Sequence, residues 1–142
     1  TIERQEINAA DGATGAPGDI TIYKDGAIFK AIEVTERPID GSRVDSTFST
    51  KITLNNAAEY LFVYTNDLPR ENALERAKAY FAQGYNINFA SITDLTIHIL
   101  LSGDEAFRTA YNERMFELFN AQDVQATIKV AWNDALTEAM QA

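Results

Sequence analysis

Two apolar, β-branched runs flank the segment Lys24-Asp25-Gly26 and indicate a β-hairpin within residues 15–38. Gly26 can adopt the positive φ that a tight hairpin turn requires. The hairpin carries two acids, Asp19 at the start of the first run and Glu33 near the end of the second. The register of the two strands therefore decides whether these carboxylates meet.

Two loops are compatible with the turn residues. A two-residue Asp25-Gly26 loop would place Asp19 opposite Ile32 and would send Asp19 and Glu33 to opposite sides of the sheet. A three-residue loop of residues 24–26, a type I turn closed by a left-handed glycine, would place Asp19 opposite Ala31 with Glu33 as its diagonal neighbour.

The alternation of polar and apolar residues favours the three-residue loop. Under that register Asp19, Thr21, Glu33 and Thr35 share one face, and a slip of one residue would mix polar with aliphatic residues. We therefore expect both carboxylates on one face of the sheet. The opposite, hydrophobic face would consist of Ile20, Ile22, Ile28, Ile32 and Val34.

Helical and strand periodicities alternate along the rest of the chain. A short helix is predicted over residues 1–9, and Val44, Phe48 and Ile52 recur at a helical spacing of four after a start at Ser42 or Asp45. The apolar run 60–65 predicts a buried central strand. The other predicted elements are a helix over 71–83 ended by Gly84, a strand over 86–92, and helices over 93–102, over 104–120 and from Asp123 onward.

This order (helix, three strands, helix, strand) predicts an α/β fold with a mixed β-sheet core, flanked by helices and followed by C-terminal helices. Residues 60–92 are expected to form a right-handed parallel crossover. A chain of 142 residues corresponds to about one domain, so we expect a single domain with its core over about 1–100 and a helical part over about 93–142. The chain begins at Thr1 without a methionine, which suggests a processed chain or a piece of a longer protein.

Composition narrows the class of protein. Hydrophobic residues make up 46% of the chain, and no apolar run approaches the ~20 residues of a membrane-spanning helix, so no membrane partner is expected. No signal peptide is visible. The absence of cysteine excludes disulfides and thiolate metal sites and fits a cytoplasmic location.

The net charge of −9 argues against a protein that coats nucleic acid non-specifically. A local basic cleft is still compatible with this charge, because basic residues flank the hairpin. Arg37, Arg43 and Lys51 follow the second acid along the chain, and we expect them to contact DNA phosphates. The basic residues before position 52 are Arg4, Lys24, Lys30, Arg37, Arg43 and Lys51.

Two acids on adjacent strands can serve as metal ligands. Mg²⁺ takes hard oxygen ligands, usually one or two carboxylates with water and phosphate in the remaining positions. An ion held by Asp19 and Glu33 would activate a water and neutralise charge at a scissile phosphate. Acids on a strand face are also common as plain solvated residues, so the topology around them matters as much as their identity.

The segments Gly18-Asp19 and Ile32-Glu33-Val34-Thr35, joined by a hairpin and followed by strand, helix and strand, resemble the PD-(D/E)XK nuclease superfamily, especially its type II restriction endonucleases. The resemblance covers about residues 1–100 and implies a restriction-endonuclease-like mixed β-sheet core. It implies that Asp19, Glu33 and the backbone carbonyl of Val34 hold Mg²⁺. Glu6, on the predicted N-terminal helix, is a candidate additional ligand or a partner of one.

The resemblance implies a Mg²⁺-dependent endonuclease that hydrolyses DNA phosphodiester bonds in restriction-modification. It also implies a homodimer that acts on double-stranded DNA, with the helices after residue 93 as candidates for the interface. Two other functions are compatible with the sequence. One is a catalytically inactive DNA-binding domain of the same fold, and the other is an interaction domain with no role in nucleic-acid binding.

The chain departs from the family pattern at Thr35, which stands where the family has a lysine. Losing that cation would cost roughly 2.7–4 kcal/mol of transition-state stabilisation, by analogy with the loss of one preorganised donor. Lys51, Arg37 or Gln5 could replace the lysine. The substitution therefore indicates a migrated catalytic residue, a naturally inactive nuclease, or an engineered variant.

Overall fold

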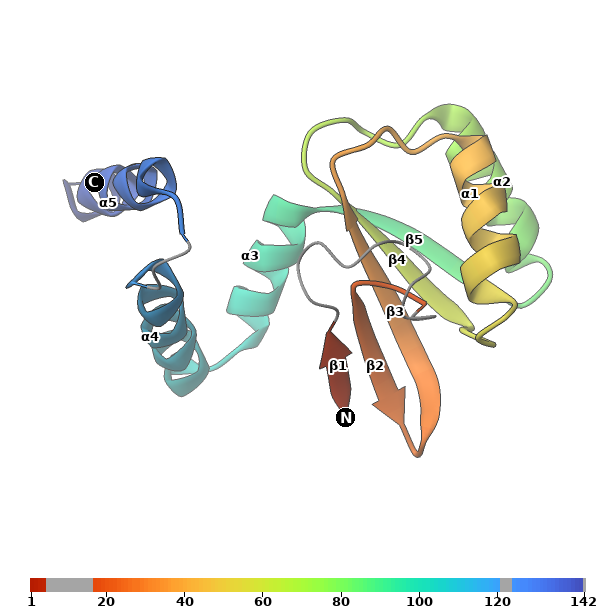
Figure 1. Cartoon of the computed structure of the whole chain (residues 1–142), viewed down its shortest axis with the longest axis horizontal. Coiled ribbons are helices and arrows are strands. Elements are labelled where there is room, and N and C mark those ends of the chain that lie inside the picture. Colours follow the sequence, from red (N-terminus) through yellow and green to blue (C-terminus); the bar gives the residue numbers. More distant parts are fainter. Residues whose placement is uncertain (5–16, 121–123, 142) are drawn as a thin grey trace. The chain divides into compact units, whose positions relative to one another are not determined.

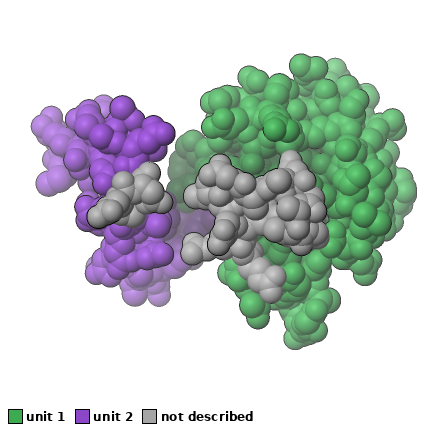
Figure 2. Space-filling model, viewed as in Figure 1, with its two compact units in different colours: residues 1–97 green, residues 98–142 purple. Residues whose placement is uncertain are grey.

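The computed structural model describes residues 1–4, 17–120 and 124–141 (Figure 1). The chain divides into two compact units, Thr1–Ile97 and His98–Ala142 (Figure 2). The first unit contains β1 (Ile2–Arg4), β2 (Ile20–Lys24), β3 (Ala27–Thr35), α1 (Gly41–Thr47), the π-helical segment η1 (Phe48–Ile52), β4 (Glu59–Tyr64), α2 (Glu71–Phe81) and β5 (Asn86–Ser91). The helix α3 (Ile92–Ser102) crosses the boundary, and α4 (Glu105–Asn120) and α5 (Ala126–Gln141) follow it.

The strands form one sheet in the order β1-β2-β3-β4-β5. β1, β2 and β3 pair antiparallel, whereas β3, β4 and β5 pair parallel. The predicted α/β fold with a mixed sheet is therefore confirmed, as is the parallel arrangement of the two strands on either side of α2. β4 lies between β3 and β5, and its residues Tyr60, Phe62 and Val63 are buried, as expected for an interior strand.

The hairpin turn has two residues, so the prediction of a three-residue turn is wrong. Lys24 pairs with Ala27, and both Asp25 (φ 53°) and Gly26 (φ 80°) have positive φ, as a type I′ turn requires. Further from the turn the register shifts: Tyr23 pairs with Ile28, but Ile22 pairs with Lys30. Phe29 is thus an extra residue in β3, a β-bulge that interrupts the ladder.

The bulge changes the pairing of the residues next to the two acids. Beyond it Thr21 pairs with Ala31 and Ile20 pairs with Ile32. Asp19 lies just before Ile20, outside the paired residues of β2, so neither loop predicted the register correctly. Asp19 is therefore not opposite Ala31, as the three-residue loop predicted, and the expectation that both carboxylates share one face stays a prediction.

The face that carries Glu33 is the one that the helices cover. Thr21, Glu33 and Thr35 are buried, whereas Val34 on the other face is 41% exposed. The isoleucine-rich set is therefore not the core face, and the bulge moves Ile28 out of it to pack against the core. That core lies between the sheet and the segments α1, η1 and α2, and it contains Ala31, Ile39, Val44, Ile52, Ala57, Tyr60, Phe62, Ala73, Ala77 and Ile87.

The N-terminal helix predicted over residues 1–9 is wrong where the structure describes it. Ile2 pairs with Ile22 and Arg4 with Ile20, so this segment is a short edge strand. The edge of β2 supplies backbone hydrogen-bond partners that a short, weakly patterned segment cannot supply for itself. Gln5 and Glu6 lie outside the described residues.

The helix predicted from Ser42 or Asp45 begins one residue before this range, at Gly41. The Asp40 carboxylate caps it by accepting a hydrogen bond from the Arg43 N–H at 3.0 Å. Val44 and Ile52 are fully buried, which confirms the inward spacing of four. The last turns are π-helical: the N–H of Thr53 donates to the Phe48 carbonyl at 3.0 Å, five residues earlier.

The predicted helices after residue 93 are present, and Gly103 separates α3 from α4 as expected. The aromatic rings of Phe119 on α4 and Trp132 on α5 lie 4.7 Å apart, which places these two helices in contact. None of the helices within residues 17–120 and 124–141 is long and apolar enough to cross a membrane.

We predict that Gly26→Ala lowers the free energy of unfolding by about 1 kcal/mol, because a Cβ disfavours left-handed backbone. A Cβ at this position would meet no atom within 4 Å, so the loss comes from the backbone conformation and not from a clash. Urea unfolding of the two proteins measures it. Gly26→Asn is the control, since asparagine tolerates this conformation, and equal losses in both variants would contradict the turn assignment.

Candidate active site

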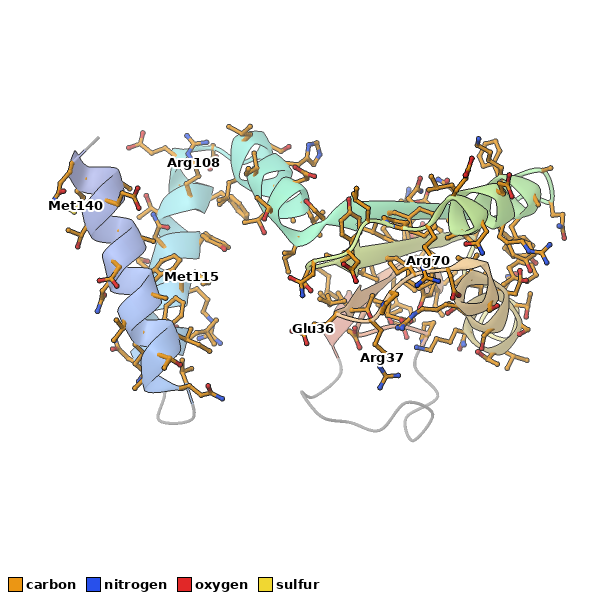
Figure 3. The ribbon with its side chains drawn as sticks, turned by 90° about the horizontal axis from the view of Figure 1, so that it is seen from above. Glu36, Arg37, Arg70, Arg108, Met115 and Met140 are labelled. Carbon is orange, nitrogen blue, oxygen red and sulfur yellow. The ribbon has the colours of Figure 1, made fainter. Side chains whose placement is uncertain are left out.

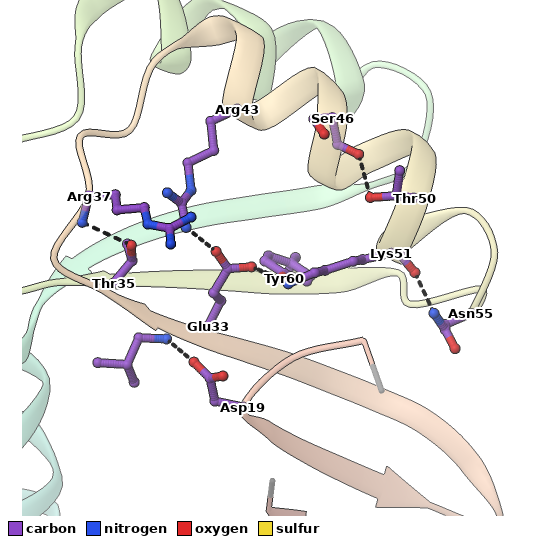
Figure 4. A network of polar contacts seen from close by, with 11 residues as sticks. Asp19, Glu33, Thr35, Arg37, Arg43, Ser46, Thr50, Lys51, Asn55 and Tyr60 are labelled. Atoms are coloured by element: carbon purple, nitrogen blue, oxygen red, sulfur yellow. Dashed lines mark hydrogen bonds and ion pairs between the residues drawn. The ribbon is translucent and has the colours of Figure 1, made fainter. Parts of the chain in front are cut away.

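Glu33 is the centre of a polar cluster under the helices. It projects from β3 on the covered face and is only 6% exposed. Its Oε1 accepts a hydrogen bond from Arg43 Nη2 at 2.6 Å (Figure 4). Its Oε2 accepts from Lys51 Nζ at 2.9 Å and from the Tyr60 hydroxyl at 2.7 Å. Three donors therefore satisfy one buried carboxylate, as a charge at this depth requires.

The donors come from two different layers of the fold. Tyr60 belongs to β4, where it pairs with Ala31, and it faces the helices together with the neighbouring Glu33 side chain. Arg43 lies in the first turn of α1 and Lys51 near the end of η1. The cluster thus joins the helical layer to the sheet.

Electrostatics keep Glu33 charged. Burial alone would raise the pKa of Glu33, but the hydrogen bonds from Tyr60, Arg43 and Lys51, with the positive charge of Lys51, lower this pKa below its ordinary value. Burial, the charge of Glu33 and the hydrogen bond to it raise the pKa of Tyr60 well above its ordinary value, and the charge of Asp19 adds to this. Tyr60 is therefore a neutral donor to Glu33 at any working pH.

Asp19 stands at the start of β2, beside β3. Its Oδ2 accepts a hydrogen bond from the Val34 N–H at 2.7 Å, so the side chain continues the ladder where the β2 backbone ends (Figure 4). The N–H and C=O of one residue point to the same side of an extended strand. The Val34 carbonyl is therefore directed toward the side of β3 on which Asp19 lies.

Thr35 is buried and already bonded. Its Oγ1 accepts a hydrogen bond from the Arg37 N–H at 3.1 Å, which closes the turn after β3. The Arg37 side chain is exposed and extends away from the ribbon (Figure 3). Arg43 does not point outward in this way, because it is bonded to Glu33 and its side chain is 23% exposed.

The donor atoms suit Mg²⁺ in kind, since the carboxylates of Asp19 and Glu33 and the Val34 carbonyl are all hard oxygen ligands. Within the described ranges no group of three or more His, Cys, Asp or Glu side chains could hold an ion. An ion here would depend on two carboxylates, a carbonyl and water, which is a common environment for Mg²⁺.

The structure brings most of the candidate residues together. Asp19, Glu33, Val34 and Thr35 lie at one end of the hairpin, with Arg43 and Lys51 above them. The candidate accessory residues Gln5 and Glu6 lie outside the described residues. Sequence reasoning missed Tyr60, although a hydroxyl within an apolar strand needs a hydrogen-bond partner and could have revealed it.

The site combines acids at one end of a hairpin with basic residues on the helix that covers the mixed sheet. A metal-dependent phosphodiesterase would need a site of this class. Residues 1–66, just under half of the chain, match the family model of the SacI restriction endonuclease C-terminal domain. The matched segment runs from β1 through β4 and contains every residue of the polar cluster. It supports a likeness to type II restriction endonucleases. No curated protein sequence matches the chain.

We predict that Glu33→Gln lowers the free energy of unfolding by roughly 3 kcal/mol, because it leaves Arg43 and Lys51 without their counter-charge. Glu59→Gln is the matched control. Glu59 pairs with Lys30 at 3.1 Å, but both side chains are about one-third exposed, so we expect a loss below about 1 kcal/mol. Urea unfolding measures both variants. An unchanged or higher stability of Glu33→Gln would contradict the stabilising role of the cluster.

Proposed function

We propose that the chain is a Mg²⁺-dependent endonuclease domain of restriction type that hydrolyses phosphodiester bonds of double-stranded DNA. The observation that carries the proposal is the position of Lys51, whose Nζ lies 2.9 Å from the carboxylate of Glu33. In this proposal two acids, a strand carbonyl and a lysine form the site at one end of the sheet. The match of residues 1–66 to a restriction endonuclease domain supports the same function.

In this proposal Asp19, Glu33 and the Val34 carbonyl would hold the ion. When bound, Mg²⁺ activates a water and neutralises charge at the scissile phosphate. Tyr60 keeps the Glu33 carboxylate in place through its 2.7 Å hydrogen bond. Burial of this cluster excludes bulk water from the inner side of the site and so strengthens its electrostatic interactions.

Lys51 is the candidate for the migrated lysine. It approaches Glu33 from the helical layer, whereas a lysine at position 35 would extend from β3 itself. Lys51 thus supplies from η1 the positive charge that a lysine at position 35 would supply from β3, next to the same Glu33 carboxylate. Thr35 then serves the turn after β3, through its hydrogen bond with the Arg37 N–H.

Arg37 is the candidate phosphate contact outside the cluster, because it is exposed and follows β3 directly. An endonuclease of restriction type would act on DNA in the cytoplasm. It would act as a homodimer, and the helices after residue 93 are the candidates for the dimer interface. These features depend on the proposed activity.

A second candidate function is a DNA-binding domain of this fold without catalytic activity. The three donors on Glu33 favour it, because a carboxylate has about four lone-pair positions and little capacity is left for an ion. The two candidates differ in one measurable respect: only the first cleaves plasmid DNA with Mg²⁺.

We predict that the whole chain nicks plasmid DNA in Mg²⁺ or Mn²⁺ and that Lys51→Met lowers the rate by about 10²–10³, the effect of losing one preorganised donor. Thr35→Lys in the Lys51→Met background is expected to restore part of that loss, since both positions lie beside Glu33. Lys30→Met, which removes a charge paired with Glu59, is the control for lost positive charge.

The cleavage assay also decides between the two candidate functions. Asp19→Asn must abolish the cleavage, which excludes a contaminating nuclease. Robust cleavage by Thr35→Lys alone, with none by the unmodified chain, would refute the active-enzyme proposal and favour the inactive DNA-binding domain.

We predict that Arg37→Ala weakens binding to duplex DNA about equally across sequences and reduces the slope of log affinity against log salt by about 1, as the loss of one phosphate contact does. Arg76→Ala is the control, because Arg76 is an exposed arginine on α2 that pairs with Asp45 at 3.1 Å. Fluorescence anisotropy over a range of salt concentrations measures both. Equal slopes for Arg37→Ala and the unmodified chain would exclude Arg37 from the interface.

A further inference from the structure

The two oxygens of Glu33 have different kinds of partner. Oε2 receives both the Tyr60 hydroxyl at 2.7 Å and Lys51 Nζ at 2.9 Å. For Oε1 the described residues provide the guanidinium of Arg43, at 2.6 Å. Oε1 can therefore change its partner by breaking one contact, whereas Oε2 would have to break two.

The burial of the donors also indicates that Oε1 can change its partner more easily than Oε2. Tyr60 is 1% exposed and belongs to an interior strand, so its hydroxyl cannot leave without disturbing the core. The side chains of Arg43 and Lys51 are each 23% exposed, so Tyr60 is the buried donor that holds Oε2, whereas Oε1 has no such donor among the described residues. The backbone of Arg43 is fixed by the Asp40 cap, but its long side chain can turn toward solvent while α1 stays in place.

A guanidinium in contact with a carboxylate opposes the binding of a metal ion to that carboxylate, because like charges repel across a few ångströms of poorly screened interior. Arg43 and the ion proposed above therefore compete for Glu33. The same arginine fork that matches a carboxylate also matches a phosphate.

We propose that Arg43 is a positioning residue that couples the metal to the substrate: it neutralises Glu33 in the metal-free protein, leaves Oε1 when a divalent ion binds, and becomes available to an anionic phosphate group. The inference rests on the proposed metal site. It assigns Arg43 a role distinct from that of Lys51, which stays on Oε2 with Tyr60.

The first test measures Mn²⁺ binding by the whole chain without DNA, from the electron paramagnetic resonance signal of free Mn²⁺. Arg43→Met is expected to bind Mn²⁺ about tenfold more tightly than the unmodified chain, the factor that corresponds to removing a competing interaction of about 1.4 kcal/mol. Arg43→Lys should stay close to the unmodified chain. Arg37→Met removes an equal charge close by in the chain without touching Glu33, and it should change the affinity far less.

The second test uses Ca²⁺ as a probe ion and measures its effect on the affinity for duplex DNA. Coupling between two ligands is reciprocal, so an ion that releases Arg43 must tighten DNA binding, and DNA must tighten ion binding by the same factor. The unmodified chain should show this coupling, and Arg43→Met should lose most of it. A variant that merely loosened the fold would not bind Mn²⁺ more tightly.

The outcomes separate this inference from the proposed function. Mn²⁺ binding that Asp19→Asn abolishes but Arg43→Met leaves unchanged or weakens would keep the metal site and overturn the role of Arg43. An Arg43→Met effect on Mn²⁺ affinity that Arg37→Met reproduces in full would also overturn it. The effect would then come from the loss of a nearby positive charge and not from the contact between Arg43 and Glu33. Absence of Mn²⁺ binding in every variant, including Arg43→Met, would overturn both.

Discussion

The side chain of Glu33 lies beneath α1 and η1, where an unpaired carboxylate would be several kcal/mol less stable than in water. Its partners come from the helical layer and from the neighbouring strand β4, so satisfying one charge also joins the two layers of the first unit. The position of the helices over the sheet and the position of the proposed catalytic carboxylate are thus consequences of the same contacts. A substitution here affects stability and chemistry together, which is why stability and ion binding have to be measured separately.

The π-helical segment η1 contributes to this arrangement. In a regular α-helix two residues eight apart, such as Arg43 and Lys51, are about 80° out of phase around the axis. The wider turn of a π-helix reduces that offset, and both cations reach the same carboxylate. Such segments are frequent at functional sites. The irregularity in the backbone therefore has a chemical consequence, because it brings the second cation to Glu33.

Much of the fold could be predicted from the sequence because its signals are local: the turn glycine, the spacing of Val44 and Ile52, and the apolar run of β4. The hairpin shows where such reasoning is limited. A turn shorter by one residue and a bulge at Phe29 shift the register by amounts that preserve parity, so Thr21, Glu33 and Thr35 share one buried face despite two wrong assumptions about the register. The alternation could not reveal which face the helices cover, and the Ile-rich face was a misleading indicator. β1 depends on pairing with β2, which no local pattern of residues 1–4 encodes.

The charge balance of the site changes the meaning of Thr35. The buried carboxylate of Glu33 already pairs with two cations, Arg43 and Lys51. A third cation from position 35 would be the surplus charge, and burying it without a partner would raise the energy of the folded chain. The absence of a lysine at this position therefore does not imply the absence of its charge. Thr35 is compatible with an active site if Lys51 supplies that charge. Replacing Thr35 by lysine would destabilise the folded chain while Lys51 is present.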